Sequence, residues 1–373
     1  MSNICIIDAD LTNKKRHRFP NLAAMKISSY HKQKGDIVTL KLDIRNLMSK
    51  LNYNNIYSYD KVYVTKVFTD TLFPDNVLQL QHVEYGGTGF FYDKSPQLPH
   101  EIEHIMPDYH LYDDFVTSQE FIDHDRRDTF EIYQEVNIGK LTTGCFRGCE
   151  FCVNRNCKSV KLHSPYTEFF DPNNKYFCFL DDNFLGYKKS IPLLEELFDF
   201  GKTIQFKQGL DIRLLNERNV KLLTNIKYKG DYIFAFDNIK DKDMIIEKLT
   251  LWRKYNPAST KLYVLCAFDR NNNYDLDFWK SDLIDTLERM KILMQFQCIP
   301  YFMRYERFKE CPWSYFYTLL TKWCMNPGNY KKLSIREYFE KWKHNKVLFG
   351  ILQYIDINYY IDLKYEDFKS KEL

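Results

Sequence analysis

The chain has 373 residues, 45% of them hydrophobic, a length that allows two or three domains with a large core. Its 53 Lys and Arg against 50 Asp and Glu give a formal charge of +3, so charge provides no global argument for a polyanionic partner. No apolar run is long enough to span a membrane, no signal peptide is recognisable, and the ten cysteines lack disulfide-framework spacing, so we expect a cytoplasmic protein without membrane association.

Short apolar runs alternate with amphipathic ones across residues 1–105, a rhythm that predicts a parallel sheet with helices on both faces. The expected strands are residues 4–7, 36–40, 61–65 and 81–85. A helix is expected over residues 22–33, ended by Gly35. We therefore predict a Rossmann-like domain over residues 1–105, followed by a linker over residues 106–134 that contains a short helix near residues 118–124.

Ligands of parallel sheets bind beyond the carboxyl ends of the strands, and two stretches of this first domain are expected there, residues 10–21 and 86–89. The second stretch reads Gly86-Gly87-Thr88-Gly89, but neither a GxGxxG motif nor a P-loop lysine accompanies it. We interpret it as a tight turn that uses glycine at positive φ, rather than as a phosphate site.

A second series of alternating strands and helices is expected from residue 135 to residue 305. The expected strands are residues 136–143, 176–180, 203–208, 232–236, 261–267 and 297–303, and the intervening helices are residues 191–200, 214–226, 241–255 and 276–295. Six strands with helices between them predict a partial (β/α)6 TIM-type barrel, whose chemistry would lie on the loops after the strands. Residues 306–373 are expected to form a helical C-terminal region, with its clearest helices at residues 312–325 and 334–345.

Three cysteines follow the first expected barrel strand with the spacing C-x3-C-x2-C. They are Cys145, Cys149 and Cys152, and a short loop brings such residues together at little entropic cost. Thiolates select soft metals, so the guest would be zinc or an iron–sulfur cluster. Structural zinc needs four protein ligands, whereas this local set stops at three. A cubane held by three cysteines would leave one iron open to a small molecule.

This motif resembles the signature of the radical S-adenosylmethionine (SAM) enzymes, in which an aromatic residue precedes the third cysteine, as Phe151 does here. The resemblance covers roughly residues 135–305. It implies that the three cysteines hold a 4Fe-4S cluster whose open iron binds SAM. Reductive cleavage of SAM would release a 5′-deoxyadenosyl radical that abstracts hydrogen from a substrate. A flavodoxin or ferredoxin-type protein would donate the electron.

The same resemblance assigns cofactor contacts to polar residues after later strands. Asp181-Asp182-Asn183-Phe184 resembles a D-D-x-F motif that lies near the methionine amino group, with Asp182 favoured over Asp181. Gln208-Gly209-Leu210-Asp211-Ile212-Arg213 resembles a Q-G-x-D-x-R motif. Gln208 or Asp211 would bind ribose hydroxyls, Arg213 would pair with the methionine carboxylate, and Asp237 would be a further polar contact. The alternative role for each acid is to cap a helix.

The first domain also resembles the cobalamin-binding domain that many radical SAM enzymes carry. Its resemblance rests on Pro20-Asn21-Leu22-Ala23-Ala24-Met25-Lys26 and on Gly35-Asp36-Ile37-Val38. The D-x-H-x-x-G motif that supplies the cobalt-ligating histidine is absent, and His17 has neither the aspartate nor the glycine of that motif. We therefore do not expect cobalamin, and we interpret the domain as degenerate, packing on the barrel or helping to close over substrate.

Two other functions remain open at this stage, a cobalamin-dependent radical SAM methyltransferase and a non-catalytic zinc-binding protein. The substrate is unresolved among a small molecule, a nucleoside, a nucleic acid and a peptide. The seven remaining cysteines are interpreted as small buried hydrophobic residues without a second cluster. These are Cys5, Cys157, Cys178, Cys266, Cys298, Cys311 and Cys324.

Overall fold

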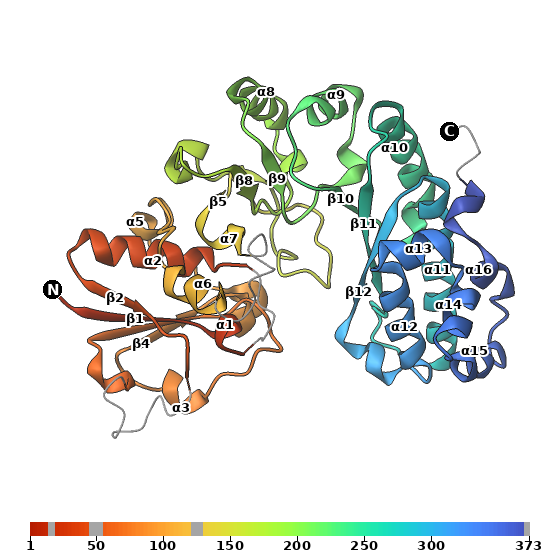
Figure 1. Cartoon of the computed structure of the whole chain (residues 1–373), viewed down its shortest axis with the longest axis horizontal. Coiled ribbons are helices and arrows are strands. Elements are labelled where there is room, and N and C mark those ends of the chain that lie inside the picture. Colours follow the sequence, from red (N-terminus) through yellow and green to blue (C-terminus); the bar gives the residue numbers. More distant parts are fainter. Residues whose placement is uncertain (14–18, 45–54, 121–129, 369–373) are drawn as a thin grey trace. The chain divides into compact units, whose positions relative to one another are not determined.

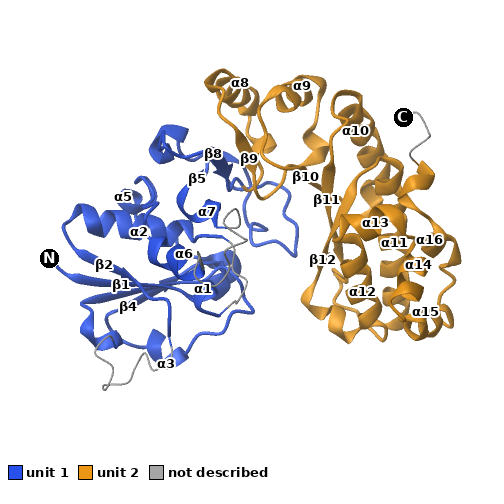
Figure 2. Cartoon of the chain, in the orientation of Figure 1, with its two compact units in different colours: residues 1–181 blue, residues 182–373 orange. Residues whose placement is uncertain are grey.

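The computed structural model describes residues 1–13, 19–44, 55–120 and 130–368. The chain forms two compact units, residues 1–181 and residues 182–373 (Figure 2). Both units combine helices with parallel strands, so the expected mixed α/β class is confirmed. In the described part of the chain, no helix combines the length and the apolar character that crossing a membrane requires.

Unit 1 begins with a four-stranded sheet in the order β2-β1-β3-β4, in which all neighbouring strands are parallel (Figure 1). Its strands are β1 (Asn3–Asp8), β2 (Ile37–Leu40), β3 (Lys61–Thr65) and β4 (Val83–Gly86). The four expected strands are therefore present, although β4 begins two residues later than predicted. Helix α2 (Leu22–Gln33) has the predicted bounds because Asn21 caps its first turn, accepting a hydrogen bond from the Ala24 amide at 3.1 Å.

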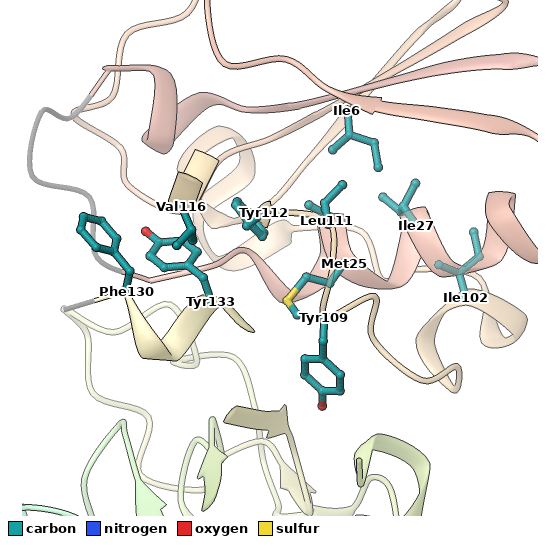
Figure 3. Close-up of a cluster of buried hydrophobic side chains, with 11 residues drawn as sticks. Ile6, Met25, Ile27, Ile102, Tyr109, Leu111, Tyr112, Val116, Phe130 and Tyr133 are labelled. Carbon is teal, nitrogen blue, oxygen red and sulfur yellow. The ribbon is translucent and has the colours of Figure 1, made fainter. Parts of the chain in front are cut away.

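The central strand β1 is buried on both faces, which explains its continuous apolar sequence. Ile6 points to one face and joins Met25 and Ile27 of α2 in a hydrophobic cluster (Figure 3). Cys5 and Ile7 point to the other face and join a second cluster with residues of β3. The sheet is thus the middle layer of a three-layer arrangement.

Residues 106–134, which were expected as a linker, contribute large side chains to the first cluster. Tyr112 and Tyr133 are fully buried there, and their rings lie 5.2 Å apart between centroids (Figure 3). The Tyr112 hydroxyl donates to the carboxylate of Asp8 at the end of β1, at 2.8 Å. The helices of this region and of the rest of unit 1 are α1 (Ala9–Asn13), α3 (Asp75–Leu78), α4 (Thr88–Phe91), α5 (His100–Glu103), α6 (Asp113–Glu120) and α7 (Glu131–Gln134).

The second half of unit 1 contains two further strand pairs. Strand β5 (Val136–Gly139) is parallel to β8 (Tyr176–Phe179), and β6 (Thr142–Thr143) is antiparallel to β7 (Lys161–Leu162). The single strand predicted over residues 136–143 is therefore wrong, because it is broken between Gly139 and Thr142. A side chain at Gly139 would come within 2.4 Å of the Phe169 ring, so the backbone approaches this ring too closely for any other residue.

Unit 2 contains a parallel sheet in the order β10-β11-β12, built from β10 (Tyr232–Ala235), β11 (Thr260–Cys266) and β12 (Ile299–Arg304). Strand β9 (Ile204–Phe206) precedes them, and Ile204 bridges to Tyr228 in the parallel sense. The helices are α8 (Ser190–Phe200), α9 (Glu217–Asn225), α10 (Lys242–Tyr255), α11 (Leu276–Gln295), α12 (Ser314–Cys324), α13 (Pro327–Lys332), α14 (Ile335–Lys341), α15 (Asn345–Leu352) and α16 (Asn358–Asp362). Strands and helices alternate up to β12, and the region after it is helical, as predicted.

Candidate functional site

The three cysteines lie on one loop of unit 1, residues 144–160, which we call the cysteine loop. Strands β6 and β7 pair at its base, with Thr142 opposite Leu162 and Thr143 opposite Lys161. The amide of His163 then donates to the carbonyl of Leu141 at 2.8 Å. The loop is therefore an excursion between two short paired strands, and it leaves from the region that follows β5.

Successive turns fold the middle of the cysteine loop. The Cys152 amide donates to the Cys149 carbonyl at 2.9 Å, and the Arg155 amide donates to the Cys152 carbonyl at 3.1 Å. The Asn154 amide donates to the sulfur of Cys152 at 3.4 Å. An amide pointing at a sulfur stabilises the thiolate form, the form that binds metal.

The structure brings Cys145, Cys149 and Cys152 into one loop as half-buried side chains. Within the described ranges, no three His, Cys, Asp or Glu side chains are close enough to hold a metal ion. Three thiolates repel one another, and the attraction that gathers them comes from the metal itself. The donor set of three half-buried cysteines on one loop, with an amide directed at one sulfur, fits an iron–sulfur cluster chemically.

Asp181 ties the base of the cysteine loop to the end of β8. Its side chain is 2% exposed and accepts hydrogen bonds from the amide and hydroxyl of Thr142, both at 2.6 Å, and from the Leu141 amide at 3.3 Å. Burial raises the pKa of Asp181 to about 6, although these donors act in the opposite direction. Asp182, the favoured cofactor contact, is half-buried and begins unit 2.

The Q-G-x-D-x-R segment of unit 2 forms a local ion-pair cluster. Asp211 accepts from the Arg213 amide at 3.2 Å, which caps a short 3₁₀ turn, and from the Arg213 side-chain Nε at 2.8 Å. The Arg213 guanidinium also reaches Asp241 at 3.4 Å. The Asp211 carboxylate therefore caps the turn and pairs with Arg213 at the same time. Gln208, which is close to them in the sequence, is exposed.

Asp237 follows β10, and burial raises the pKa of its carboxyl group above the ordinary range. It accepts a hydrogen bond from the Leu265 amide at 3.1 Å. Sequence reasoning missed its neighbour Arg289, which is 3% exposed on α11 and donates to the carbonyls of Phe236, Asp237 and Leu265 at 2.8–3.1 Å. In the sequence, Arg289 could have been recognised as an arginine on the apolar face of a long helix, because a charge buried there needs hydrogen-bond partners.

Comparison with known proteins gives no relative for this arrangement. No protein-family model, no curated protein and no solved structure matches the chain.

The carboxyl edge of the first sheet contains two buried aspartates whose oxygens are engaged within unit 1. Asp8 accepts from Tyr112 and from backbone amides of α1, and burial raises the pKa of Asp8 to about 6. Asp10 accepts from the Thr71 hydroxyl and from the Val67 amide. Gly87 has φ +108°, as predicted for the tight turn, and its α-carbon packs against the Lys66 carbonyl. His17 lies outside the described residues.

Six of the seven other cysteines are buried, which confirms their interpretation as apolar core residues, whereas Cys157 is half-buried beside the cysteine loop. Burial raises the pKa of Cys5 to about 12 and that of Cys311 to about 12. Such thiols are protonated and unreactive near neutral pH. They provide internal references for experiments on the loop cysteines.

Substituting Gly144 with alanine is expected to disorder the base of the cysteine loop. Gly144 has φ +91°, and an added Cβ would lie 2.5 Å from the Ser159 carbonyl oxygen, so the chain must shift. Gly148→Ala is the matched control, because Gly148 also has positive φ (+63°) but its nearest contact would be 3.8 Å away. We expect Gly148→Ala to lower the free energy of unfolding by about 1 kcal/mol and Gly144→Ala by more. Urea unfolding measures both, and equal losses would contradict the role of the Ser159 contact.

Proposed function

We propose that the chain is a radical SAM enzyme in which Cys145, Cys149 and Cys152 hold a 4Fe-4S cluster with one iron open to SAM. The observation that carries the proposal is the C-x3-C-x2-C spacing on a single loop after a parallel strand, with all three cysteines half-buried. A set of three soft ligands supports a cluster with an open iron better than a closed four-ligand zinc site. The proposal includes a partial (β/α)6 barrel over residues 135–305.

When bound, the cluster would supply the electron that cleaves the sulfonium of SAM, leaving methionine and a 5′-deoxyadenosyl radical able to take hydrogen from a substrate. The protein residues would bind and orient SAM. Asp182 would face the methionine ammonium, with Asp181 at the loop base, and Phe151 would line the cluster. Gln208, Asp211, Arg213 and Asp237 would provide the remaining polar contacts. A flavodoxin or ferredoxin-type protein is the proposed electron donor, and a corrinoid is not part of the proposal.

Anaerobic reconstitution with iron and sulfide tests this function. We expect a brown protein with roughly four irons per chain, and cleavage of SAM to 5′-deoxyadenosine and methionine under a strong reductant. A colourless, iron-free chain that binds one zinc through the same cysteines would overturn the proposal in favour of a zinc-binding protein. SAM cleavage that transfers a methyl group only when a corrinoid is added would identify the methyltransferase instead.

Arg213→Lys separates a cofactor contact from a structural ion pair. Lysine keeps the positive charge but loses the forked geometry that suits a carboxylate. If Arg213 binds the methionine carboxylate, the dissociation constant of SAM should rise about tenfold, equivalent to about 1.4 kcal/mol. Calorimetric titration of the reconstituted protein measures it, and Arg218→Lys, on the exposed pair with Glu195, is the control. Unchanged affinity in Arg213→Lys would assign the residue to its pair with Asp211 alone.

A further inference from the structure

The tip of the cysteine loop is docked on the segment that follows β4 in the first sheet. The Tyr92 hydroxyl donates to the carbonyl of Phe151, the residue between Glu150 and Cys152, at 2.7 Å. Asp93 accepts from the Arg155 side-chain Nε and from the Asn156 side-chain amide, both at 2.7 Å. The Arg155 guanidinium also lies 5.3 Å from the centre of the Tyr92 ring.

These contacts reach the part of the loop that carries the second and third cysteines. Phe151 directly precedes Cys152, and Arg155 donates its own amide to the Cys152 carbonyl. The side chain of Asp93 is 7% exposed and that of its partner Arg155 is 42% exposed, and their hydrogen bond holds the pKa of Asp93 below its ordinary range. A carboxylate that accepts from two donors of one loop fixes the position of that loop more firmly than a single ion pair does.

The segment that presents Tyr92 and Asp93 is itself held tightly. Tyr92 has φ +49° and ψ −110°, a positive-φ conformation that is uncommon outside glycine. An added Cβ at Gly89 would come within 2.8 Å of the Phe68 carbonyl oxygen, and at Gly87 within 2.2 Å of the Lys66 carbonyl oxygen. The strained backbone at Tyr92 is therefore maintained by close packing on the end of β3, and it aims the two side chains at the loop.

A second set of contacts attaches the strand that leaves the cysteine loop. His163 Nε2 lies 3.3 Å from the Glu103 carboxylate of α5, and Lys26 of α2 donates to the same carboxylate at 2.6 Å. Although burial opposes it, the hydrogen bond with His163 and the Lys26 charge lower the pKa of Glu103 to about 2. His104 lies 3.0 Å from Glu168, further along the same segment. The base and the tip of the loop are thus both attached to the first sheet and its helices.

The pairing of the two-residue strands β6 and β7 fixes only the ends of this 17-residue loop. Without further contacts, the residues between these ends would sample many conformations. We propose that the sheet domain of residues 1–105 is the scaffold of the cysteine loop, with Tyr92 and Asp93 as the residues that position its tip. The domain restrains the part of the loop that carries Cys149 and Cys152 before any metal arrives. The purpose of this scaffold, to position a loop that binds a cluster, rests on the proposed function. The docking of the loop on Tyr92 and Asp93 does not itself depend on metal.

Cysteine alkylation in the metal-free, anaerobic full-length chain tests the scaffold. The variants are Asp93→Ala and Tyr92→Phe, and their controls are Glu84→Ala, which breaks an exposed pair with Lys61 on the same sheet, and Tyr57→Phe, which alters an exposed tyrosine. Mass spectrometry follows iodoacetamide labelling at each cysteine separately. We expect labelling of Cys149 and Cys152 to accelerate roughly fivefold in Tyr92→Phe, the effect of one lost hydrogen bond on local opening, and by more in Asp93→Ala, which loses two. Labelling should stay unchanged in the controls.

Buried Cys178 of β8 reports whether a variant has unfolded as a whole. If Cys178 becomes reactive in Asp93→Ala, then Tyr92→Phe, which removes only a hydroxyl, decides the question. Wild-type labelling rates at Cys149 and Cys152 in Tyr92→Phe, with Cys178 protected, would overturn the proposal. Failure of the wild-type chain to bind iron would instead overturn the proposed function and leave the labelling result standing. Release of iron to a chelator from the reconstituted protein should be faster in the same test variants.

Discussion

Replacing Cys145, Cys149 or Cys152 with alanine, one at a time, is expected to abolish stable iron binding and SAM cleavage. A cluster with three protein ligands has no spare ligand, because the proposed site already leaves one iron open. Each loss therefore leaves two irons without protein sulfur, and the cluster dissociates or fails to assemble. Iron and sulfide content after anaerobic reconstitution, together with 5′-deoxyadenosine production, measures the effect.

Cys157→Ala is the matched control for these variants. Cys157 is a half-buried cysteine close in sequence to the loop cysteines, and its amide donates to the Asn154 carbonyl through the backbone, which alanine preserves. We expect Cys157→Ala to bind wild-type amounts of iron. If the Cys157 variant loses iron while a Cys145, Cys149 or Cys152 variant keeps it, the three cysteines that we propose as ligands are the wrong set.

The sequence predicted secondary structure well where local signals and burial agree. Helix α2 has its predicted bounds because an asparagine cap opens it and a polar, glycine-containing segment ends it. The continuous apolar run of residues 4–7 correctly indicated a strand, and β1 is buried on both faces. The interruption after β5 was missed. It coincides with the close approach of Gly139 to Phe169, a contact between residues 30 positions apart that periodicity does not report.

In the candidate site, too, the features that are local in the sequence were predicted and the non-local ones were not. The C-x3-C-x2-C spacing is local, so the sequence alone identified the loop and its possible ligands. Its attachment to Asp93 joins residues 62 positions apart, and its attachment through Glu103 depends on where α5 packs. Arg289 was missed because its partners are backbone carbonyls, which any sequence offers. Non-local polar contacts form only where the fold brings their residues together. In the sequence, only a charged residue within an apolar helix pattern, such as Arg289, indicates such contacts.

Asp181→Ala is expected to destabilise unit 1 and loosen the base of the cysteine loop. The substitution leaves three buried donors without an acceptor, the amide and hydroxyl of Thr142 and the amide of Leu141. We expect the free energy of unfolding to fall by about 3 kcal/mol at pH 7, on the order of 1 kcal/mol per orphaned donor. Thr142→Val is the graded control, because it removes one of these donors and keeps the side-chain shape, and should cost about 1 kcal/mol.

The pH dependence of this loss provides a second, independent check. Burial raises the folded-state pKa of Asp181 to about 6 from an ordinary value of 3.8, so between these values the folded chain retains a proton that the unfolded chain releases. The stability that Asp181 confers is therefore greatest below pH 4 and falls as pH rises through 6, with a maximum slope of about 1.4 kcal/mol per pH unit. Alanine does not titrate, so the difference between wild type and Asp181→Ala should be larger at pH 5 than at pH 7. Urea unfolding of both proteins across this range measures the difference. A difference that stays constant between pH 5 and pH 7 would mean that the donors from Leu141 and Thr142 outweigh burial and hold the pKa of Asp181 at or below its ordinary value, so that a charged carboxylate holds the base of the loop across this range.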